Sequence, residues 1–336
     1  MDLNIYNEKK DNCFINLYFK ILILISVFLF YIGNSILKKL DFSQKEILRL
    51  ENQISGNLKF NISEKIMLLR IITNNKNYQG IENCLLNDPD SQLCIYHLIA
   101  PKQVRGKERI LVGEKSDGCY VLLNDFANIK IAYSFGVGPF IQFDKELADK
   151  GIDVYMYDHT VNSLPYNHEK FHWKKIGITR KNKTNNVLKS LDELIIENGH
   201  SSENNMILKM DIEYHEWESL IDVSEKILSQ FKYIVLELHF NDEKEANINL
   251  LYYNVLKNIH KTHQCFYIHC ANRYKVVKFG NNRICKFMEI SYVIRKDYEF
   301  DKDLTVYPIK EFDFALNAPN MEEVNINFLK LFDDIN

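Results

Sequence analysis

Hydrophobic positions between residues 107 and 262 fall into short runs that alternate with helical patterns. Between these strand-like runs, apolar residues recur at helical spacing, over 142–150, 186–197, 216–231 and 244–261. Because parallel strands need crossover helices, the alternation predicts right-handed βαβ units, hence an α/β fold whose mostly parallel sheet is covered on both faces. The runs are rich in Ile, Val, Leu and Tyr and have the length of buried strands; they lie at 130–135, 152–157, 174–178, 206–210 and 233–238.

Both ends of this region depart from the alternation. Residues 109–112 and 119–123 are β-type runs on either side of a turn that ends in Asp-Gly, which predicts an antiparallel hairpin. Residues 265–270 and 285–295 are two further β runs with no helical pattern between them. The sequence therefore predicts a C-terminal antiparallel strand pair appended to the parallel sheet.

An apolar segment near the N-terminus predicts a membrane anchor. Residues 14–37 carry one charge, Lys20, near one end, and a bilayer core needs about 20 apolar residues in a helix. A cleaved signal peptide and a buried helix are the alternatives, but no small-residue cleavage site follows the run. We expect a short tail (1–13), a transmembrane signal anchor (14–37), a stem and entry segment (38–105) and a globular domain (106–336).

The orientation of the anchor is not decided by the flanking lysines, which occur on both sides. A short tail left in the cytosol favours a single-pass type II protein whose globular domain is lumenal, in the endoplasmic reticulum or Golgi. Glycosylation sequons at Asn61 and Asn182 are permitted by that topology, and a Cys84–Cys94 disulfide would fit it.

Composition narrows the choice of partner. Hydrophobic residues make up 46% of the chain, with 12 glycines and 6 prolines, which excludes collagen-like and wholly disordered classes. Lysine plus arginine (42) nearly balances aspartate plus glutamate (45), giving a net charge of −3. A protein that binds a phosphate backbone needs a basic surplus, so no nucleic acid partner is expected.

The end of the first parallel strand carries a candidate cofactor loop. Gly136 and Gly138 would let the backbone approach a ligand closely, and Asp158 closes the next strand, where a carboxylate can accept ribose hydroxyls. Asp144 is a second, nearer carboxylate. The third glycine of a pyrophosphate fingerprint is missing, which favours S-adenosylmethionine over a dinucleotide. The alternative is a tight turn with Asp158 as a helix N-cap.

Further motifs follow the same order along the chain. The motifs are RILVG with DGCYVL (109–113, 117–122), YSFGVG with FD (133–138, 143–144), YMYDHT (155–160), LKMDIE with EW (208–213, 216–217), and ELH, HCAN and EISY (237–239, 269–272, 289–292).

Together these motifs resemble the FkbM-type methyltransferase family, particularly its membrane-anchored methyltransferase-like relatives, over residues 101–328. The resemblance implies a class I methyltransferase fold, which is Rossmann-like, and methyl transfer from S-adenosylmethionine, usually to oxygen. It supports the cofactor role of the glycine loop and the second-strand acid. The residues expected to bind cofactor are Ser134, Gly136, Gly138, Asp144, Asp158, His159 and Asp211, with His159 either stacked near the adenosine or on the surface.

Methyl transfer to a hydroxyl needs alignment of donor and acceptor and removal of a proton. We expect Asp211 to face the cleft and His239, which shares a strand face with Glu237, to be the general base. His269 is a rival base. Asp211, Glu237 and His239 could also hold Mg²⁺ or Mn²⁺, although a metal is not favoured. The acceptor class stays open between a small molecule, a glycan and a lipid head group.

Two other functions remain open. A type II glycosyltransferase would use Asp211-Ile212-Glu213 as a metal and nucleotide motif, although the glycine loop before it argues against this. The other is a fold that binds S-adenosylmethionine or a protein partner without turnover, because Cys119 and Tyr214 stand where the resembled pattern has glycine.

Overall fold

The computed structural model describes residue 95 and residues 98–115, 118–240, 246–271, 276–279 and 282–313. The chain divides into two compact units, Met1–Asn61 and Ile62–Asn336, and all of the described residues belong to the second. No helix within this described part is long and apolar enough to cross a membrane. The predicted anchor (14–37), the Asn61 sequon and the Cys84–Cys94 disulfide lie outside it.

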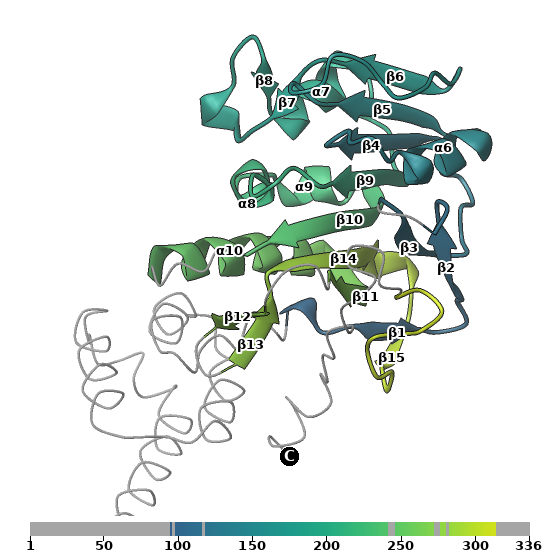
Figure 1. Cartoon of the computed structure of the whole chain (residues 1–336), viewed down its shortest axis with the longest axis vertical. Helices are drawn as coiled ribbons and strands as arrows, with labels where there is room; N and C mark the ends of the chain where they lie inside the picture. The colour runs from purple at the N-terminus through teal and green to yellow at the C-terminus, as the bar shows by residue number, and fades with distance from the viewer. Residues whose placement is uncertain are drawn as a thin grey trace, which may run out of the picture. The chain divides into compact units, whose positions relative to one another are not determined.

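A seven-stranded sheet organises the fold, with strand order β11-β14-β10-β9-β4-β5-β6 (Figure 1). The five strands from β10 to β6 pair in parallel, whereas β14 is antiparallel to both of its neighbours. This confirms the α/β class, the mostly parallel sheet and the C-terminal antiparallel pair. The strands are β4 (Ile131–Phe135), β5 (Asp153–Tyr157), β6 (Phe171–Lys174), β9 (Met206–Met210), β10 (Phe231–His239), β11 (His263–Cys270) and β14 (Phe287–Ile294).

One strand lies elsewhere than predicted. The sheet strand predicted at 174–178 is β6, which lies earlier and shares only Lys174 with that range. Within the range, β7 (Gly177–Ile178) pairs in parallel with β8 (Leu188–Lys189) in a separate two-stranded sheet. β6 is the edge of the sheet, and its residues are half-buried or exposed. An edge strand does not need a continuous apolar run, so hydropathy favoured the wrong segment.

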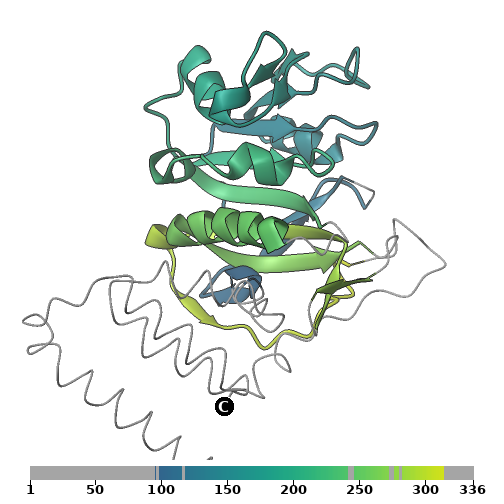
Figure 2. The ribbon, with the colours of Figure 1, turned by 90° about the vertical axis from the view of Figure 1, so that its left-hand side faces the viewer.

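Helices cover both faces of the sheet. α6 (Gln142–Asp149) lies on one face, and α8 (Glu216–Leu220), α9 (Glu225–Leu228) and α10 (Ala246–Thr262) lie on the other (Figures 1 and 2). Opposite faces are expected where right-handed crossovers run in opposite directions along a sheet.

Two predicted helices were too long, and serine N-caps explain both errors. The pattern at 216–231 is two short helices, because the Ser224 side chain accepts a hydrogen bond from the Ile227 amide and starts α9 afresh. The pattern at 186–197 becomes a helix only at α7 (Leu191–Glu197), where Ser190 and Glu193 form a capping box. Two single 3₁₀ turns, η2 (Lys181–Lys183) and η3 (Arg295–Asp297), also occur.

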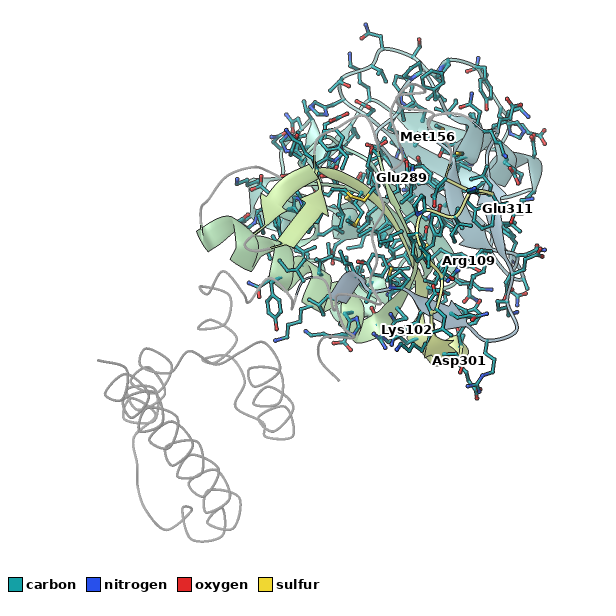
Figure 3. All side chains as sticks on the ribbon, turned by 60° about the horizontal axis from the view of Figure 1, so that its bottom comes forward. Lys102, Arg109, Met156, Glu289, Asp301 and Glu311 are labelled. Carbon is teal, nitrogen blue, oxygen red and sulfur yellow. A yellow bond between two sulfur atoms is a disulfide. The ribbon has the colours of Figure 1, made fainter. Side chains whose placement is uncertain are left out.

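Smaller strand pairs flank the sheet. β2 (Arg109–Val112) and β3 (Tyr120–Leu123) form the predicted antiparallel hairpin. β1 (Lys102–Val104) pairs with β15 (Phe300–Lys302), so the folded part begins before the boundary predicted at residue 106; Figure 3 labels Lys102 and Asp301 at this edge.

A further hairpin joins β11 to β14. Its strands are β12 (Val276–Phe279) and β13 (Asn282–Cys285), and the Cys270–Cys285 disulfide closes its base. The sequence predicted a helix-free connection here but neither the hairpin nor the disulfide.

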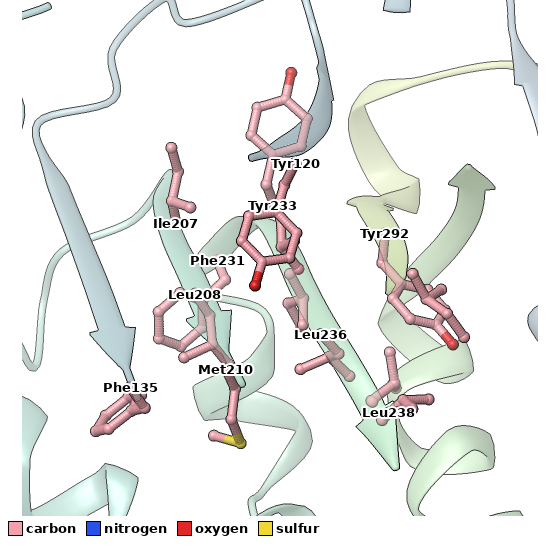
Figure 4. Packing of buried hydrophobic residues seen from close by; sticks show 14 of the residues in the cluster. Tyr120, Phe135, Ile207, Leu208, Met210, Phe231, Tyr233, Leu236, Leu238 and Tyr292 are labelled. Carbon is pink, nitrogen blue, oxygen red and sulfur yellow. The ribbon is translucent and has the colours of Figure 1, made fainter. Parts of the chain in front are cut away.

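The core follows the central strands. All five residues of β9 are buried, and Figure 4 shows Leu208 and Met210 of this strand beside Leu236 of β10. Each such apolar side chain contributes about 1.5–3 kcal/mol on burial. The strands whose ends carry the candidate site are therefore the most firmly fixed part of the sheet.

A buried ion pair joins Asp125, which follows β3, to Lys232 of β10. The Asp125 carboxylate contacts Lys107 Nζ at 2.7 Å, Lys232 Nζ at 2.9 Å and the Tyr298 hydroxyl at 3.0 Å. The Lys232 side chain is 8% exposed. Burial pushes the Asp125 pKa upward, but these hydrogen bonds outweigh it and hold the pKa well below its usual range.

We expect Asp125→Asn to lower the free energy of unfolding by about 2–4 kcal/mol at pH 7, because Lys232 is left buried without its carboxylate. Because the folded-state pKa of Asp125 is lowered, its contribution to stability is present above about pH 4 and is lost as the pH falls through the folded-state pKa. The difference in unfolding free energy between the wild type and Asp125→Asn should therefore narrow in acid. Urea unfolding from pH 7 to pH 3 measures it. Asp149→Asn, which removes an exposed pair with Lys145, is the control and should change stability by less than about 0.5 kcal/mol. An Asp125→Asn deficit as small as the control's would contradict the prediction.

Candidate functional site

The strand order reverses between β4 and β9, which makes this the switch point of the sheet. β4 leads to β5 on one side, whereas β9 lies on the other side and leads away to β10. The register pairs Phe135 with both Tyr157 and Met210, so the three strands end level. Ligands of open α/β sheets bind beyond the carboxyl ends of the strands at such a point.

The predicted glycine loop leaves β4 at this edge. Gly136 has φ +85°, and its amide donates a hydrogen bond to the Tyr157 carbonyl at 3.1 Å. A Cβ on Gly136 would lie 1.6 Å from the Asp211 carbonyl oxygen, so the chain's own backbone requires glycine here. Gly138 differs: the nearest atom to a Cβ there is the Phe140 amide nitrogen, at 3.9 Å. Gly138 is thus the position at which a ligand could approach the loop.

Asp158 binds the glycine loop directly. Its Oδ2 accepts from the Val137 amide at 2.9 Å, and its Oδ1 accepts from the Thr160 amide at 2.7 Å and the Thr160 hydroxyl at 2.6 Å. Burial raises the pKa of Asp158, but these hydrogen bonds outweigh it and the pKa is lowered. A carboxylate has about four acceptor positions, so about one remains for a ribose hydroxyl. Asp158 is not a helix N-cap, since its bonds hold a loop.

Two of the predicted cofactor residues lie under the loop instead of lining it. The Ser134 and Asp144 side chains are buried, with 1% and 3% of their surfaces exposed. Burial raises the pKa of Asp144, and Lys209 and Ser134 partly oppose the rise. Lys209, itself buried in β9, donates to the Gly136 carbonyl at 2.7 Å. These three side chains support the loop from the interior, which differs from the direct contact predicted for Ser134 and Asp144.

His159 takes the surface position that the sequence left open. It is exposed, and its Nδ1 would lie 2.5 Å from a Cβ on Gly177 in β7. Its ring therefore packs against β7, and the absence of a side chain at Gly177 makes room for it.

On the other side of the switch point, polar side chains form a row across three adjacent strands. Glu237 of β10 pairs with Glu289 of β14, which in turn pairs with His269 of β11. His269 Nδ1 lies 3.3 Å from Glu289 Oε2 (Figure 3 labels Glu289). Their side chains are between 12% and 18% exposed. Asp211 follows β9 beside this row, and its Oδ2 accepts from the Tyr120 hydroxyl at 3.2 Å.

His239, the predicted base, is enclosed. The residue is fully buried, and its ring lies 5.1 Å from the Tyr214 ring and 4.4 Å from the Phe287 ring. An acceptor therefore cannot touch it in this conformation, which overturns its predicted position on an open cleft. The enclosing Tyr214 stands where the resembled pattern has glycine.

A buried carboxylate fixes the orientation of His239. Nδ1 lies 3.0 Å from Glu216 Oε1, which also accepts from the Ile212 amide at 2.8 Å. Nε2 lies 3.4 Å from Glu213 Oε2 and 3.8 Å from Glu237 Oε2, and the latter confirms that Glu237 and His239 share a strand face. Burial lowers the His239 pKa, but the hydrogen bond and charge of Glu216, with the neighbouring acids, more than offset it and the pKa is raised.

The segment between Asp211 and Glu216 has an unusual backbone. Glu213 has φ +52° and Tyr214 has φ +74°, both in the left-handed region that favours glycine. An L-residue there is destabilised by roughly 1–2 kcal/mol. Strain of this kind gathers at functional sites, where the surrounding structure holds it in place.

Because of this φ, we expect Tyr214→Gly to be more stable than Tyr214→Ala by about 0.5–1 kcal/mol. Both variants lose the ring contacts to His239, and only glycine removes the strain; its greater freedom in the unfolded chain offsets part of that gain. Urea unfolding of the two proteins measures the difference. The usual order, with alanine more stable than glycine, would show that residue 214 is not held in the left-handed region.

The prediction from sequence missed Lys209, Glu216 and Tyr120 as members of the site. Lys209 had a signal, since a charged residue inside an apolar strand run needs a buried partner. Glu216 had only its place within the resembled motif. Tyr120 likewise had only its place within a resembled motif, and a hairpin far away in sequence brings its hydroxyl to Asp211. Burial, followed by the charge of Asp211, raises the pKa of Tyr120.

Comparison with models of known protein families found no match to this chain, and comparison with curated proteins found none either.

Proposed function

We propose that this protein is an S-adenosylmethionine-dependent methyltransferase that methylates an oxygen of a small-molecule, glycan or lipid acceptor. The observation that carries the proposal is the meeting of Gly136, Asp158 and Asp211 at the switch point of the sheet. The Val137 amide bonds to Asp158, and the Asp211 backbone lies against Gly136. A glycine loop and two acids, Asp158 and Asp211, at one edge of the sheet suit a nucleoside cofactor.

The details of the loop favour an adenosyl group over a dinucleotide. Gly138 leaves open space on the loop, and Asp158 is charged with about one acceptor position left for a ribose hydroxyl. Lys209, which could otherwise neutralise a phosphate, is buried and donates to the Gly136 carbonyl. A sulfonium donor brings no phosphate charge into this acidic surrounding.

His269 suits the role of base in this proposal better than His239. It is partly exposed, and two carboxylates flank its ring: Glu289 Oε2 lies 3.3 Å from Nδ1 and Asp313 Oδ1 lies 4.0 Å from Nε2. Carboxylates placed in this way orient an imidazole and favour its taking a proton from an acceptor hydroxyl. Asp211 and Glu237 lie beside it in the same group of strand ends and would position the acceptor. His239, enclosed by Tyr214, would not touch the acceptor and would instead help to position Asp211 and Glu237.

A glycosyltransferase that uses a nucleotide sugar stays the second candidate, because one observation favours it. Asp211, the first acid of the Asp-x-Glu motif, lies with Glu216 and His239 in a group able to hold a metal ion, which such enzymes use to bind a diphosphate.

Thermal shift separates these functions. We expect S-adenosylhomocysteine to raise the melting temperature of the purified full-length chain, with UDP-sugar plus Mn²⁺ giving no more than Mn²⁺ alone. Stabilisation by the nucleotide sugar in place of S-adenosylhomocysteine would reject methyl transfer. Stabilisation by neither would favour a fold that binds a protein partner without turnover.

We further propose that the domain is lumenal and anchored to the membrane through residues 14–37. Two observations support an oxidising, glycosylating compartment: Cys270 and Cys285 form a disulfide, and Asn182 of the second sequon is exposed. Digestion with an endoglycosidase should increase the mobility of the wild-type chain more than that of Asn182→Gln. No mobility shift in either chain, with both cysteines alkylated as free thiols, would place the domain in the cytosol.

A further inference from the structure

We propose that Asp211, Glu216 and His239 form a binding site for a divalent transition-metal ion of the Mn²⁺ class. The site differs from the one weighed from sequence, since the buried Glu216 takes the place of Glu237. It shares Asp211 with the proposed methyltransferase site, but binding of the ion does not depend on methyl transfer.

The three residues come from three fixed elements. Asp211 follows β9, Glu216 opens α8 and His239 ends β10. One potential ligand atom from each lies within 4.8 Å of the other two. A metal with bonds of about 2.0–2.2 Å holds its ligands roughly 3–4 Å apart, so small side-chain rotations would close the site.

Unpartnered buried atoms point to a missing ligand. Glu216 and His239 are both fully buried, yet Glu216 Oε2 and His239 Nε2 have no hydrogen-bond partner. Leaving such an atom unsatisfied costs about 1–3 kcal/mol, and more for a charged group. A cation bound to Glu216 Oε2 would give this oxygen the partner that it lacks, while His239 Nε2 faces Glu213 Oε2 at 3.4 Å.

The local charge also favours a cation. Four carboxylates lie in or beside the site: those of the ligands Asp211 and Glu216, and those of the neighbours Glu213 and Glu237. Among the described residues, Lys209 Nζ lies 3.8 Å from Asp211 Oδ2 and bonds to a carbonyl, and His239 adds a positive charge when protonated. The acids therefore outnumber the positive groups among the described residues of this cluster.

The strained segment gives the ion a structural role. Glu213 and Tyr214, both with positive φ, lie between Asp211 and Glu216, so an ion bound by those two residues would clamp both ends of the segment. Glu213 is 76% exposed and Asp211 26%, which marks the side from which an ion would enter. Two carboxylates and one imidazole suit Mn²⁺, Fe²⁺ or Zn²⁺ better than Ca²⁺, which prefers oxygen alone.

The test uses the full-length chain in detergent, stripped with a chelator, and titrates Mn²⁺ by calorimetry and by the loss of the free-ion electron paramagnetic resonance signal. We expect one saturable site. Asp211→Asn alters the one partly exposed ligand of the three, so we expect it to disturb folding least. It should weaken Mn²⁺ binding at least tenfold, and Glu216→Gln and His239→Asn should do the same. Glu289→Gln is the matched control, because it removes a nearby carboxylate that is not a ligand, and should change the affinity less than about threefold.

Three results would overturn the site: no saturable Mn²⁺ binding by the wild type, unchanged affinity in Asp211→Asn, or an equal loss in Glu289→Gln, which would indicate a diffuse acidic field. Circular dichroism identifies a variant that fails to fold, and the Asp211→Asn result then decides alone. Stabilisation by S-adenosylhomocysteine without metal is measured separately, so failure of this site is distinguishable from failure of the proposed function.

Discussion

Gly136→Ala is expected to lower the free energy of unfolding by at least about 4 kcal/mol, enough to prevent folding of a marginally stable domain. The new Cβ would lie 1.6 Å from the Asp211 carbonyl oxygen, and φ +85° is itself unfavourable for alanine. Relief requires β4 and the segment after β9 to move apart, although Phe135 and Met210 are paired and fully buried. Urea unfolding, or the soluble yield where the variant does not fold, measures the effect.

Gly138→Ala is the matched control, two residues further along the same loop. Its Cβ would meet its nearest atom at 3.9 Å, and its φ lies outside the left-handed region, so stability should change by less than about 1 kcal/mol. If the loop binds an adenosyl group, this variant folds but has lower affinity for S-adenosylhomocysteine. Equal stability of the two variants would mean that the loop does not lie against Asp211 as described.

Asp158→Ala is expected to weaken S-adenosylhomocysteine binding at least about 100-fold. The change removes the expected ribose acceptor, and it also releases the Val137 and Thr160 amides, so the loop loses the bonds that preorganise it. Charge-assisted bonds of this kind contribute about 1.5–3 kcal/mol each, and 100-fold corresponds to about 2.7 kcal/mol. Isothermal titration calorimetry measures the affinity.

Thr160→Val serves as the control for Asp158. It removes the hydroxyl that donates to Oδ1 at 2.6 Å but keeps the carboxylate and the bond to the Val137 amide. We expect an affinity loss below about tenfold. Unchanged affinity in Asp158→Ala would leave Asp158 as a purely structural link of the loop, while an equal loss in both variants would show that loop order, and not the carboxylate, determines binding.

On the acceptor side of the site, the identity of residue 214 decides whether the predicted base, His239, is accessible. The order of motifs placed His239 at a strand end beside Glu237, and it lies there. Its availability depends on residue 214, where tyrosine covers the ring that glycine would leave open. We therefore expect Tyr214→Gly to remove one of the two rings that cover His239, while Phe287 stays in place.

The sequence by itself determined the elements whose signals are local. The buried runs of β4, β5, β9 and β10, the turn between β2 and β3, and the antiparallel pair of β11 and β14 all follow from apolar periodicity and turn residues. It also determined that Gly136, Asp158 and Asp211 lie together, because residues that end neighbouring parallel strands share one edge of the sheet.

Only the tertiary structure decided which of those side chains are accessible and which residues from elsewhere join them. Ser134 and Asp144 are buried, His239 is enclosed, and Glu216 and Tyr120 complete the group around Asp211. Burial and pairing of a side chain are set by elements distant in sequence, here the hairpin that carries Tyr120 and the strand that carries Phe287. A local pattern contains no record of those contacts, so the strand ends were predictable and their chemistry was not.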